Sequence, residues 1–261
     1  MSMRKIVEKK KFLVAYMTLG YPTRDAFMEY SDILKSSGAD ILELGIPPRV
    51  AFYDGASIRT SYWRAKENGI NREAALEIAG NVDATKIILC YLGTAGELAG
   101  FMRSVARTGA SGVLIPDLGM VSPEALVSYA KASDAARLEK VFFANYNYPD
   151  GTIKTMASHN PAFIYVGLSP ITGEVAYVDP TKSIMRARGL IGGIPLAAGF
   201  GIREPRYAKM LAGMVDGIVV GSELVNIIEE NVASVARKKV ADFITSLKSV
   251  LEDASLELDS E

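Results

Sequence analysis

The chain of 261 residues is 49% hydrophobic and 23% charged, and its 29 basic and 30 acidic residues leave a net charge of −1. This composition is ordinary for a globular protein, and the charge balance gives no electrostatic reason to expect nucleic acid or an anionic membrane as the main partner. Cys90 and His159 are the only residues of their types. A single cysteine excludes an internal disulfide. A single histidine disfavours a multi-histidine metal site and a Ser-His-Asp triad.

Neither export nor membrane insertion is expected. Residues 1–11 are basic but lack the apolar core of a secretory signal, and the longest weakly polar run, residues 189–202, is too short and glycine-rich to span a bilayer. A single cysteine also fits a reducing compartment. We therefore expect a cytoplasmic protein.

Short apolar runs alternate along the chain with segments of helical periodicity. Strands are expected at residues 12–18, 41–45, 86–91, 112–116, 140–145, 163–166, 195–198 and 217–220. Helices are expected at residues 23–37, 57–68, 72–79, 94–107, 152–158 and 222–251, and the pairs Ser122-Pro123, Asp179-Pro180 and Glu204-Pro205 should open three more. Residues 252–261 are acidic and should fray.

Eight strands that alternate with helices over about 250 residues are typical of a TIM barrel. The predicted fold class is therefore α/β, a (β/α)8 barrel with eight parallel strands and outer helices. A doubly wound open sheet is the structural alternative. Because no linker or low-complexity segment interrupts the pattern, residues 1–261 are predicted to form a single barrel domain.

One carboxylate, Glu43, lies inside the apolar strand predicted at residues 41–45. Buried glutamates are rare unless they are paired or functional, and burial raises the pKa of a carboxyl towards the range that acid–base catalysis requires. The structural alternative is a Glu43 satisfied by backbone donors or an arginine. A second acid, Asp54, opens a glycine-containing turn after the same strand. Two carboxylates in different environments can divide the work, one titrating and the other holding a substrate N–H or a cation.

In a barrel of this kind the active site lies at the carboxyl ends of the strands. Lys86 and Lys140 instead begin strands, and no lysine ends one, which argues against a Schiff-base aldolase. With His159 alone, a zinc-dependent aldolase is also disfavoured. Proton transfer by carboxylates therefore remains as the predicted chemistry, with no metal and no cofactor.

Two glycine segments follow the last two predicted strands, Gly199-Phe200-Gly201 and Gly221-Ser222. Glycine lets the backbone approach an anion closely, and a helix that starts at Ser222 offers free N–H groups and the positive end of its dipole. The loops after strands seven and eight of such barrels commonly bind phosphate. The first segment alone would indicate only a tight turn, but together the two predict a phosphate site.

Aromatic side chains are expected around the same site. Tyr91, Tyr165 and Phe200 would line a pocket for a flat aromatic substrate, although core packing is the alternative for Tyr91. Tyr62 and Trp63, on the helix after the second strand, are both predicted to be core residues.

Seven short segments occur in this order along the chain: TLGYP (18–22), LELGIP (42–47), DG (54–55), PDL (116–118), ITG (171–173), GFGI (199–202) and GS (221–222). Together they resemble the tryptophan synthase alpha subunit family, and the resemblance extends over residues 12–231. The resemblance implies retro-aldol cleavage of indole-3-glycerol phosphate to indole and glyceraldehyde 3-phosphate in tryptophan biosynthesis. It also implies a beta subunit as the partner.

The resemblance assigns roles to individual residues. Glu43 falls on the family's catalytic glutamate, which moves protons at indole C3 and at the glycerol hydroxyl, and Asp54 falls on the aspartate that binds the indole N–H. The other matches are Tyr165 as a pocket tyrosine, Phe200 as the ring beside the indole, Thr172 as the lid threonine that reaches the aspartate on closure, and Gly173, Gly201, Gly221 and Ser222 as phosphate-binding positions.

Two loops depart from the family pattern. After Pro47 the family usually has Phe-Ser-Asp-Pro, where this chain has PRVA at residues 48–51, so a second loop aspartate is missing. The lid at residues 168–173 is one residue short and lacks the usual Arg-Ser-Gly lead-in. Because both loops face the beta subunit in the family, we expect weaker alpha–beta coupling here.

Two other functions stay open at this point. One is another phosphate-binding barrel enzyme, of the sugar-phosphate isomerase or prenyl-glycerol-phosphate synthase type, and a prenyl synthase should need Mg²⁺. The other is a non-catalytic subunit that only activates a partner, against which the presence of Glu43 and Asp54 argues.

Overall fold

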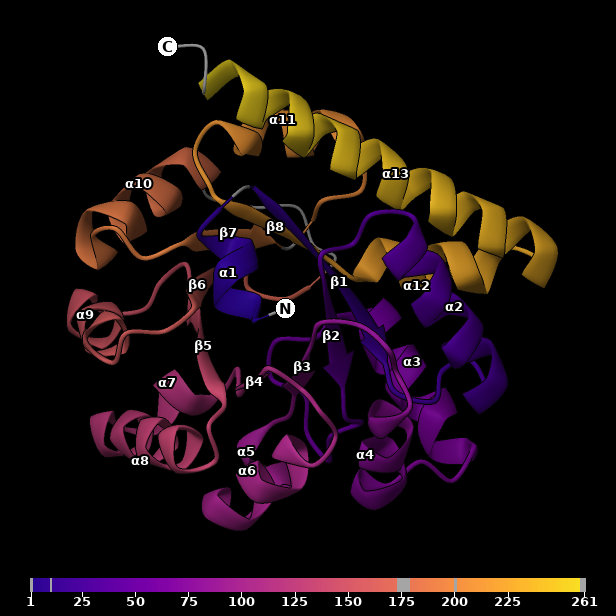
Figure 1. The fold of residues 1–261 in the computed structure, drawn as a ribbon, viewed down its shortest axis with the longest axis horizontal. Coiled ribbons are helices and arrows are strands. Elements are labelled where there is room, and N and C mark those ends of the chain that lie inside the picture. The colour runs from indigo at the N-terminus through magenta and orange to yellow at the C-terminus, as the bar shows by residue number, and fades with distance from the viewer. Residues whose placement is uncertain (1, 10, 173–178, 200, 259–261) are drawn as a thin grey trace.

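The computed structural model describes residues 2–9, 11–172, 179–199 and 201–258, and it has a closed barrel of eight parallel strands (Figure 1). The strands are β1 (Phe12–Thr18), β2 (Ile41–Gly45), β3 (Lys86–Leu89), β4 (Gly112–Leu114), β5 (Glu139–Asn145), β6 (Phe163–Gly167), β7 (Leu196–Gly199) and β8 (Gly217–Val220). Each strand pairs with the next, and β8 pairs with β1. The predicted barrel is confirmed, and the open sheet is excluded.

Helices surround the barrel on its outside, and the first of them lies across one end of it (Figure 1). They are α1 (Met3–Val7), α2 (Arg24–Ser36), α3 (Ala56–Glu67), α4 (Arg72–Gly80), α5 (Leu92–Ala95), α6 (Leu98–Ala106), α7 (Leu118–Val121), α8 (Pro123–Ala135), α9 (Asp150–Ser158), α10 (Pro180–Ile191), α11 (Pro205–Ala212), α12 (Ser222–Glu230) and α13 (Ala233–Leu258). The three predicted proline starts each open a helix. Ser122 and Asp179 also cap theirs, by accepting hydrogen bonds from the backbone N–H groups of Ala125 and Thr181.

Two predicted helices are each split in the structure. The segment predicted at residues 94–107 divides into α5 and α6 because Gly96 has a φ of +70°, which a right-handed helix cannot continue. The segment predicted at residues 222–251 divides into α12 and α13 at Asn231, whose backbone is extended. Helix α13 then runs on to Leu258, so the prediction of fraying from residue 252 is wrong as far as residue 258. Buried Leu251 anchors this part of the helix to the core.

The short helix α1 was not predicted. Its apolar residues Met3, Ile6 and Val7 follow helical spacing and are buried, although basic residues separate them. The backbone N–H of Arg4 donates to Glu139 at the start of β5, with 2.9 Å between nitrogen and oxygen. Helix α1 therefore covers the amino-terminal end of the barrel (Figure 1), and the carboxyl end is the one that carries the pocket.

Strand register brings particular side chains together inside the barrel. Tyr16 of β1 lies beside Glu43 of β2, and Phe143 of β5 lies beside Tyr165 of β6. Because the strands are parallel, their carboxyl ends and the loops that follow them meet on one face. No helix in the described part of the chain is long and apolar enough to cross a membrane.

Candidate active site

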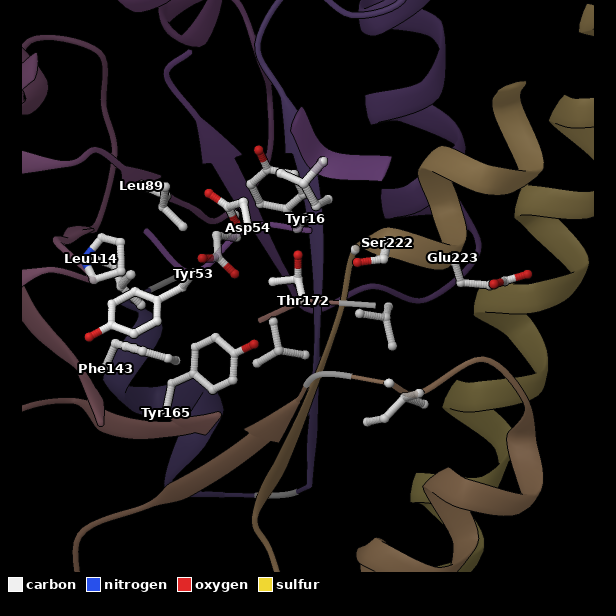
Figure 2. A pocket seen from close by; sticks show the side chains of 18 of the residues that line it. Tyr16, Tyr53, Asp54, Leu89, Leu114, Phe143, Tyr165, Thr172, Ser222 and Glu223 are labelled. Atoms are coloured by element: carbon white, nitrogen blue, oxygen red, sulfur yellow. The ribbon is translucent and has the colours of Figure 1, made fainter. Parts of the chain in front are cut away.

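A pocket of about 660 Å³, measured out to its open mouth, lies at the carboxyl ends of the strands (Figure 2). The predicted site residues that the structure describes all line it. They are Glu43, Asp54, Tyr91, Tyr165, Thr172, Gly201, Gly221 and Ser222. The other two predicted residues, Gly173 and Phe200, lie outside the described residues. Side chains from both halves of the barrel thus converge on one cavity.

Glu43 reaches this pocket from the middle of β2 and is only 2% exposed. Burial, with a smaller contribution from nearby Asp54, raises the pKa of its carboxyl to about 8. No described residue donates a hydrogen bond to the Glu43 carboxyl or forms an ion pair with it. The described residues therefore do not support the structural alternative, in which backbone donors or an arginine would satisfy Glu43.

Asp54 is 6% exposed and has two tyrosine partners. The hydroxyl groups of Tyr91 and Tyr62 both donate to its Oδ2 atom, at 2.8 and 3.0 Å. Burial raises the pKa of Asp54 to about 6, and the two tyrosine donors oppose that rise by stabilising the carboxylate. At pH 7 the pocket therefore holds a mostly ionised Asp54 close to a mostly protonated Glu43.

Thr172 joins the segment after β6 to the loop that carries Asp54. Its backbone N–H donates to the carbonyl of Tyr53 at 2.7 Å, and its hydroxyl oxygen accepts from the N–H of Gly55 at 2.8 Å. A side chain at Gly55 would collide with the Thr172 carbonyl, so the close approach requires glycine. Thr172 thus contacts the residues on both sides of Asp54.

Tyr165 approaches the acids from β6. Its ring packs edge-on against Phe143, with 5.2 Å between ring centroids, and its hydroxyl points towards the middle of the pocket in Figure 2. Burial raises the pKa of the Tyr165 hydroxyl well above the ordinary value of a tyrosine, so the hydroxyl stays neutral and can donate a hydrogen bond.

The opposite end of the pocket is lined by the predicted phosphate-site residues Gly201, Gly221 and Ser222. Gly201 has a φ of +80°, a conformation that favours glycine, and Gly221 immediately precedes α12. Ser222 lies at the start of that helix, across the pocket from Tyr53 and Phe143 (Figure 2). The first N–H groups of a helix are unsatisfied by the helix itself and attract anions. The cavity therefore has an aromatic and acidic end and an end suited to an anionic tail.

Comparison with known proteins gives the family. A family model described as tryptophan synthase alpha chain matches residues 3–255. The chain belongs to the tryptophan synthase alpha chain family. The tryptophan synthase alpha chain of Dehalococcoides mccartyi is 32% identical over 94% of this chain and 97% of its own length. That of Saccharolobus solfataricus is 32% identical over 95% of this chain and 99% of its own.

Solved structures of low sequence identity share the fold. A tryptophan synthase alpha subunit from Legionella pneumophila superposes with a TM-score of 0.84 at 22% identity, over 97% of this chain and 99% of that one. A chain of Mycobacterium tuberculosis tryptophan synthase gives a TM-score of 0.83 at 22% identity, over 95% of this chain and 96% of that one. Both support the barrel architecture.

As a tryptophan synthase alpha chain, the protein is a carbon–carbon lyase of tryptophan biosynthesis. Its reaction is the cleavage of indole-3-glycerol phosphate to indole and glyceraldehyde 3-phosphate. Because the chain belongs to this family, it is neither a sugar-phosphate isomerase nor a prenyl-glycerol-phosphate synthase, the two alternative enzyme types considered above. In the described part of this alpha chain no cluster of three His, Cys, Asp or Glu residues could hold a metal ion.

Sequence reasoning missed several residues that line the pocket of this alpha chain. Tyr16 and Tyr53 are among them, and so are the charged residues Arg203 and Glu223, which lie within two residues of the ends of the two glycine segments. Their position next to a predicted anion site was the one available signal. Tyr62 was predicted to be a core residue and is buried, but its hydroxyl group also donates a hydrogen bond to Asp54.

The prediction that Trp63 is a core residue is wrong, because its side chain is 59% exposed. Consecutive helical residues are turned by about 100°, so α3 cannot direct both Tyr62 and Trp63 at the barrel. The buried face of α3 is formed by Ile58, Ser61, Tyr62 and Ala65, and Trp63 lies on the other side.

Proposed function

We propose that Glu43 and Asp54 divide the chemistry of indole-3-glycerol phosphate cleavage. Protonated Glu43 gives its proton to indole C3, which places positive charge on the ring, and ionised Asp54 accepts a hydrogen bond from the ring N–H. The Glu43 carboxylate then takes the proton of the glycerol hydroxyl as the carbon–carbon bond breaks and its electron pair returns to the ring. Glu43 ends protonated, so protons balance over the cycle.

The observation that carries this proposal is the contrast between two buried carboxyls in one pocket. Glu43 has no described partner and a pKa of about 8, whereas Asp54 has two phenol donors and a pKa of about 6. Pairs of acids whose surroundings separate their pKa values are suited to different roles. One proton shared between these two groups resides mainly on Glu43 near neutral pH.

The remaining site residues would hold the substrate. We propose that backbone groups of Gly201, Gly221 and Ser222, with Gly173, bind the phosphate, because an anion is favoured at the start of α12. The ring would lie among Tyr91, Tyr165 and Phe200, and the Tyr165 hydroxyl would assist Glu43 as a neutral donor. Thr172 would hold the Asp54 loop in place.

We also propose three features of the setting. The partner is a tryptophan synthase beta subunit, as the family implies, although coupling to it is weaker than usual. The compartment is the cytoplasm, which suits a lone buried thiol, Cys90. Residues 1–261 form one domain, since the described strands belong to a single barrel.

Indole release from purified protein tests the roles of the acids. Glu43→Gln keeps the shape of the side chain but cannot give or take a proton, so we expect kcat to fall about a thousandfold or more with little change in KM. The matched control is Glu67→Gln, at an exposed glutamate of α3, which should leave both parameters unchanged. Turnover by Glu43→Gln at the wild-type rate would reject the proposal.

A further inference from the structure

Two tyrosines from different elements donate to the same oxygen of Asp54. Tyr91 follows β3 and Tyr62 lies on α3, and their hydroxyls are 2.8 and 3.0 Å from Oδ2. None of the described residues donates a hydrogen bond to the other oxygen, Oδ1. Because Asp54 lines the pocket, this asymmetry leaves one oxygen for a ligand.

The two donors are themselves fixed in place. The Tyr91 hydroxyl accepts a hydrogen bond from the backbone N–H of Tyr53, at 3.2 Å. Tyr62 is buried on the inner face of α3, one residue after Ser61, whose hydroxyl lies 2.6 Å from Thr18 of β1. Tyr62 is thereby tied to the rigid barrel rather than to a surface loop. A carboxylate held by two such donors has little freedom to rotate.

We propose that Tyr62 is a positioning residue for the reaction, which together with Tyr91 holds Oδ2 of Asp54 so that Oδ1 accepts the ring N–H of the substrate. The inference rests on the function proposed above and adds to it a residue on a helix outside the barrel. The ligand class that it selects is a flat heterocycle with an N–H donor.

The same contact has an electrostatic consequence. Phenol donors favour the ionised carboxylate, so losing one of them lets burial raise the Asp54 pKa towards that of Glu43. The titratable or charged groups that surround Asp54 come from β1, β2, the loop after β3, α3 and β6, and they are Tyr16, Glu43, Tyr91, Tyr62, Arg59 and Tyr165. Of these groups, the Arg59 cation favours the ionised form of Asp54. An ionised Glu43 disfavours it, because two negative charges would then lie close together.

The test is the pH dependence of kcat/KM for indole release between pH 5 and 9. We expect a bell-shaped wild-type profile, with an acid limb near the pKa of Asp54 and a basic limb near that of Glu43, both belonging to the coupled pair. In Tyr62→Phe the acid limb should move up by about one pH unit, a loss of about tenfold at pH 5. Tyr30→Phe, which removes a buried tyrosine hydroxyl from α2, should leave the profile unchanged.

A double-mutant cycle separates positioning from folding. In an Asp54→Asn background there is no carboxylate to hold, so adding Tyr62→Phe should cost much less than it does in the wild type. Tyr62→Met, which also lacks the donor, takes the place of the Phe variant if that variant does not fold, and the same outcomes apply.

The inference is overturned if a folded Tyr62 variant gives the wild-type pH profile, or if its cost is the same with and without Asp54. Failure of the proposed function is a different result, in which the wild-type protein releases no indole or Glu43→Gln stays active. Wild-type activity with loss in Glu43→Gln, but no shift in the Tyr62 variant, therefore rejects this inference alone.

Discussion

At the scale of single residues, the site keeps a carboxyl in surroundings that do not favour its charge. Glu43 projects into the barrel from a strand whose other residues are apolar or glycine, and no described donor or cation compensates its ionisation. A raised pKa is useful for proton transfer because both protonation states are then accessible near neutral pH. The same property makes the residue costly for folding at alkaline pH.

Glu43→Gln should therefore stabilise the protein while it abolishes turnover. The pKa of Glu43 is about 8 in the folded protein and near its ordinary value of 4.5 in the unfolded chain, so the folded state binds the proton more tightly. The stability that Glu43 contributes is complete below about pH 4.5 and is lost as the pH rises through 8. Glutamine does not ionise, so the variant should gain roughly 2–4 kcal/mol over wild type at pH 8 and little at pH 5.

Urea unfolding at pH 5 and pH 8 measures this difference. Glu67→Gln, on the exposed face of α3, serves as the control and should change neither value by more than about 0.5 kcal/mol. An equal effect of Glu43→Gln at both pH values would contradict the raised pKa.

At the scale of secondary-structure elements, the start of α12 combines an anion site with an anionic side chain. Glu223 lies in the first turn of α12 and lines the pocket beside Gly221 and Ser222. Burial raises its pKa, while Asn226 and Arg203 partly oppose that rise. A carboxylate in the first turn is stabilised by the helix dipole, but it also reduces the attraction that the same turn exerts on a phosphate.

Removing this charge should strengthen substrate binding. We expect Glu223→Gln to lower KM about threefold at pH 8 with kcat unchanged, because the repulsion of two anions near a protein surface is on the order of 1 kcal/mol. The effect should shrink as the pH falls, because burial raises the pKa of Glu223 and its carboxylate then takes up a proton more readily than an exposed glutamate does. Steady-state kinetics of indole release measure both parameters.

Glu230→Gln is the matched control for this prediction. It removes the same charge from the last turn of the same helix, at a residue that does not line the pocket, and it should leave KM unchanged. A KM for Glu223→Gln that equals the wild-type value at both pH values would show that the carboxylate does not oppose the phosphate.

The elements also show which parts of the site were accessible from sequence. Glu43 was found because a single carboxylate interrupts an apolar strand, and Asp54 because it precedes a glycine in the next loop, and both signals are local. The donors to Asp54 were not found, because periodicity places Tyr62 on the buried face of α3 without saying what its hydroxyl meets. That Tyr62 and Tyr91 both reach Asp54 depends on how α3 packs against the loop after β3, which no short stretch of sequence encodes.

The same limit applies to the helices. All eight strands were predicted because glycine, proline or polar residues bound short apolar runs. Gly96 was placed inside a helix because glycine is tolerated there, whereas the structure gives it a positive φ and a break. Helix α1 escaped notice because its three apolar residues are buried only once the helix lies on the amino-terminal end of the barrel, where the Arg4 backbone N–H also donates to Glu139.

At the scale of the whole molecule, the face that carries the pocket also carries exposed apolar side chains. Val50 and Phe52, in the loop after β2, are 58% and 49% exposed, and Met120 lies exposed on α7, after β4. Val50 falls where the family pattern has the second loop aspartate, and Arg49 beside it adds a positive charge. A partner surface shaped for a negatively charged loop would therefore meet an apolar and basic one.

This difference leads to a prediction about assembly. Titrating a tryptophan synthase beta subunit into the purified chain should raise the rate of indole release only weakly, because the loop lacks the charge that such a surface would recognise. Val50→Asp restores an acid at that position and should increase the activation several-fold at the same concentration of beta subunit. Val235→Asp, at an exposed valine of α13 on the outside of the barrel, is the control and should behave as the wild type. Strong, saturable activation of the unmodified chain at micromolar beta subunit would show that the altered loop does not weaken coupling.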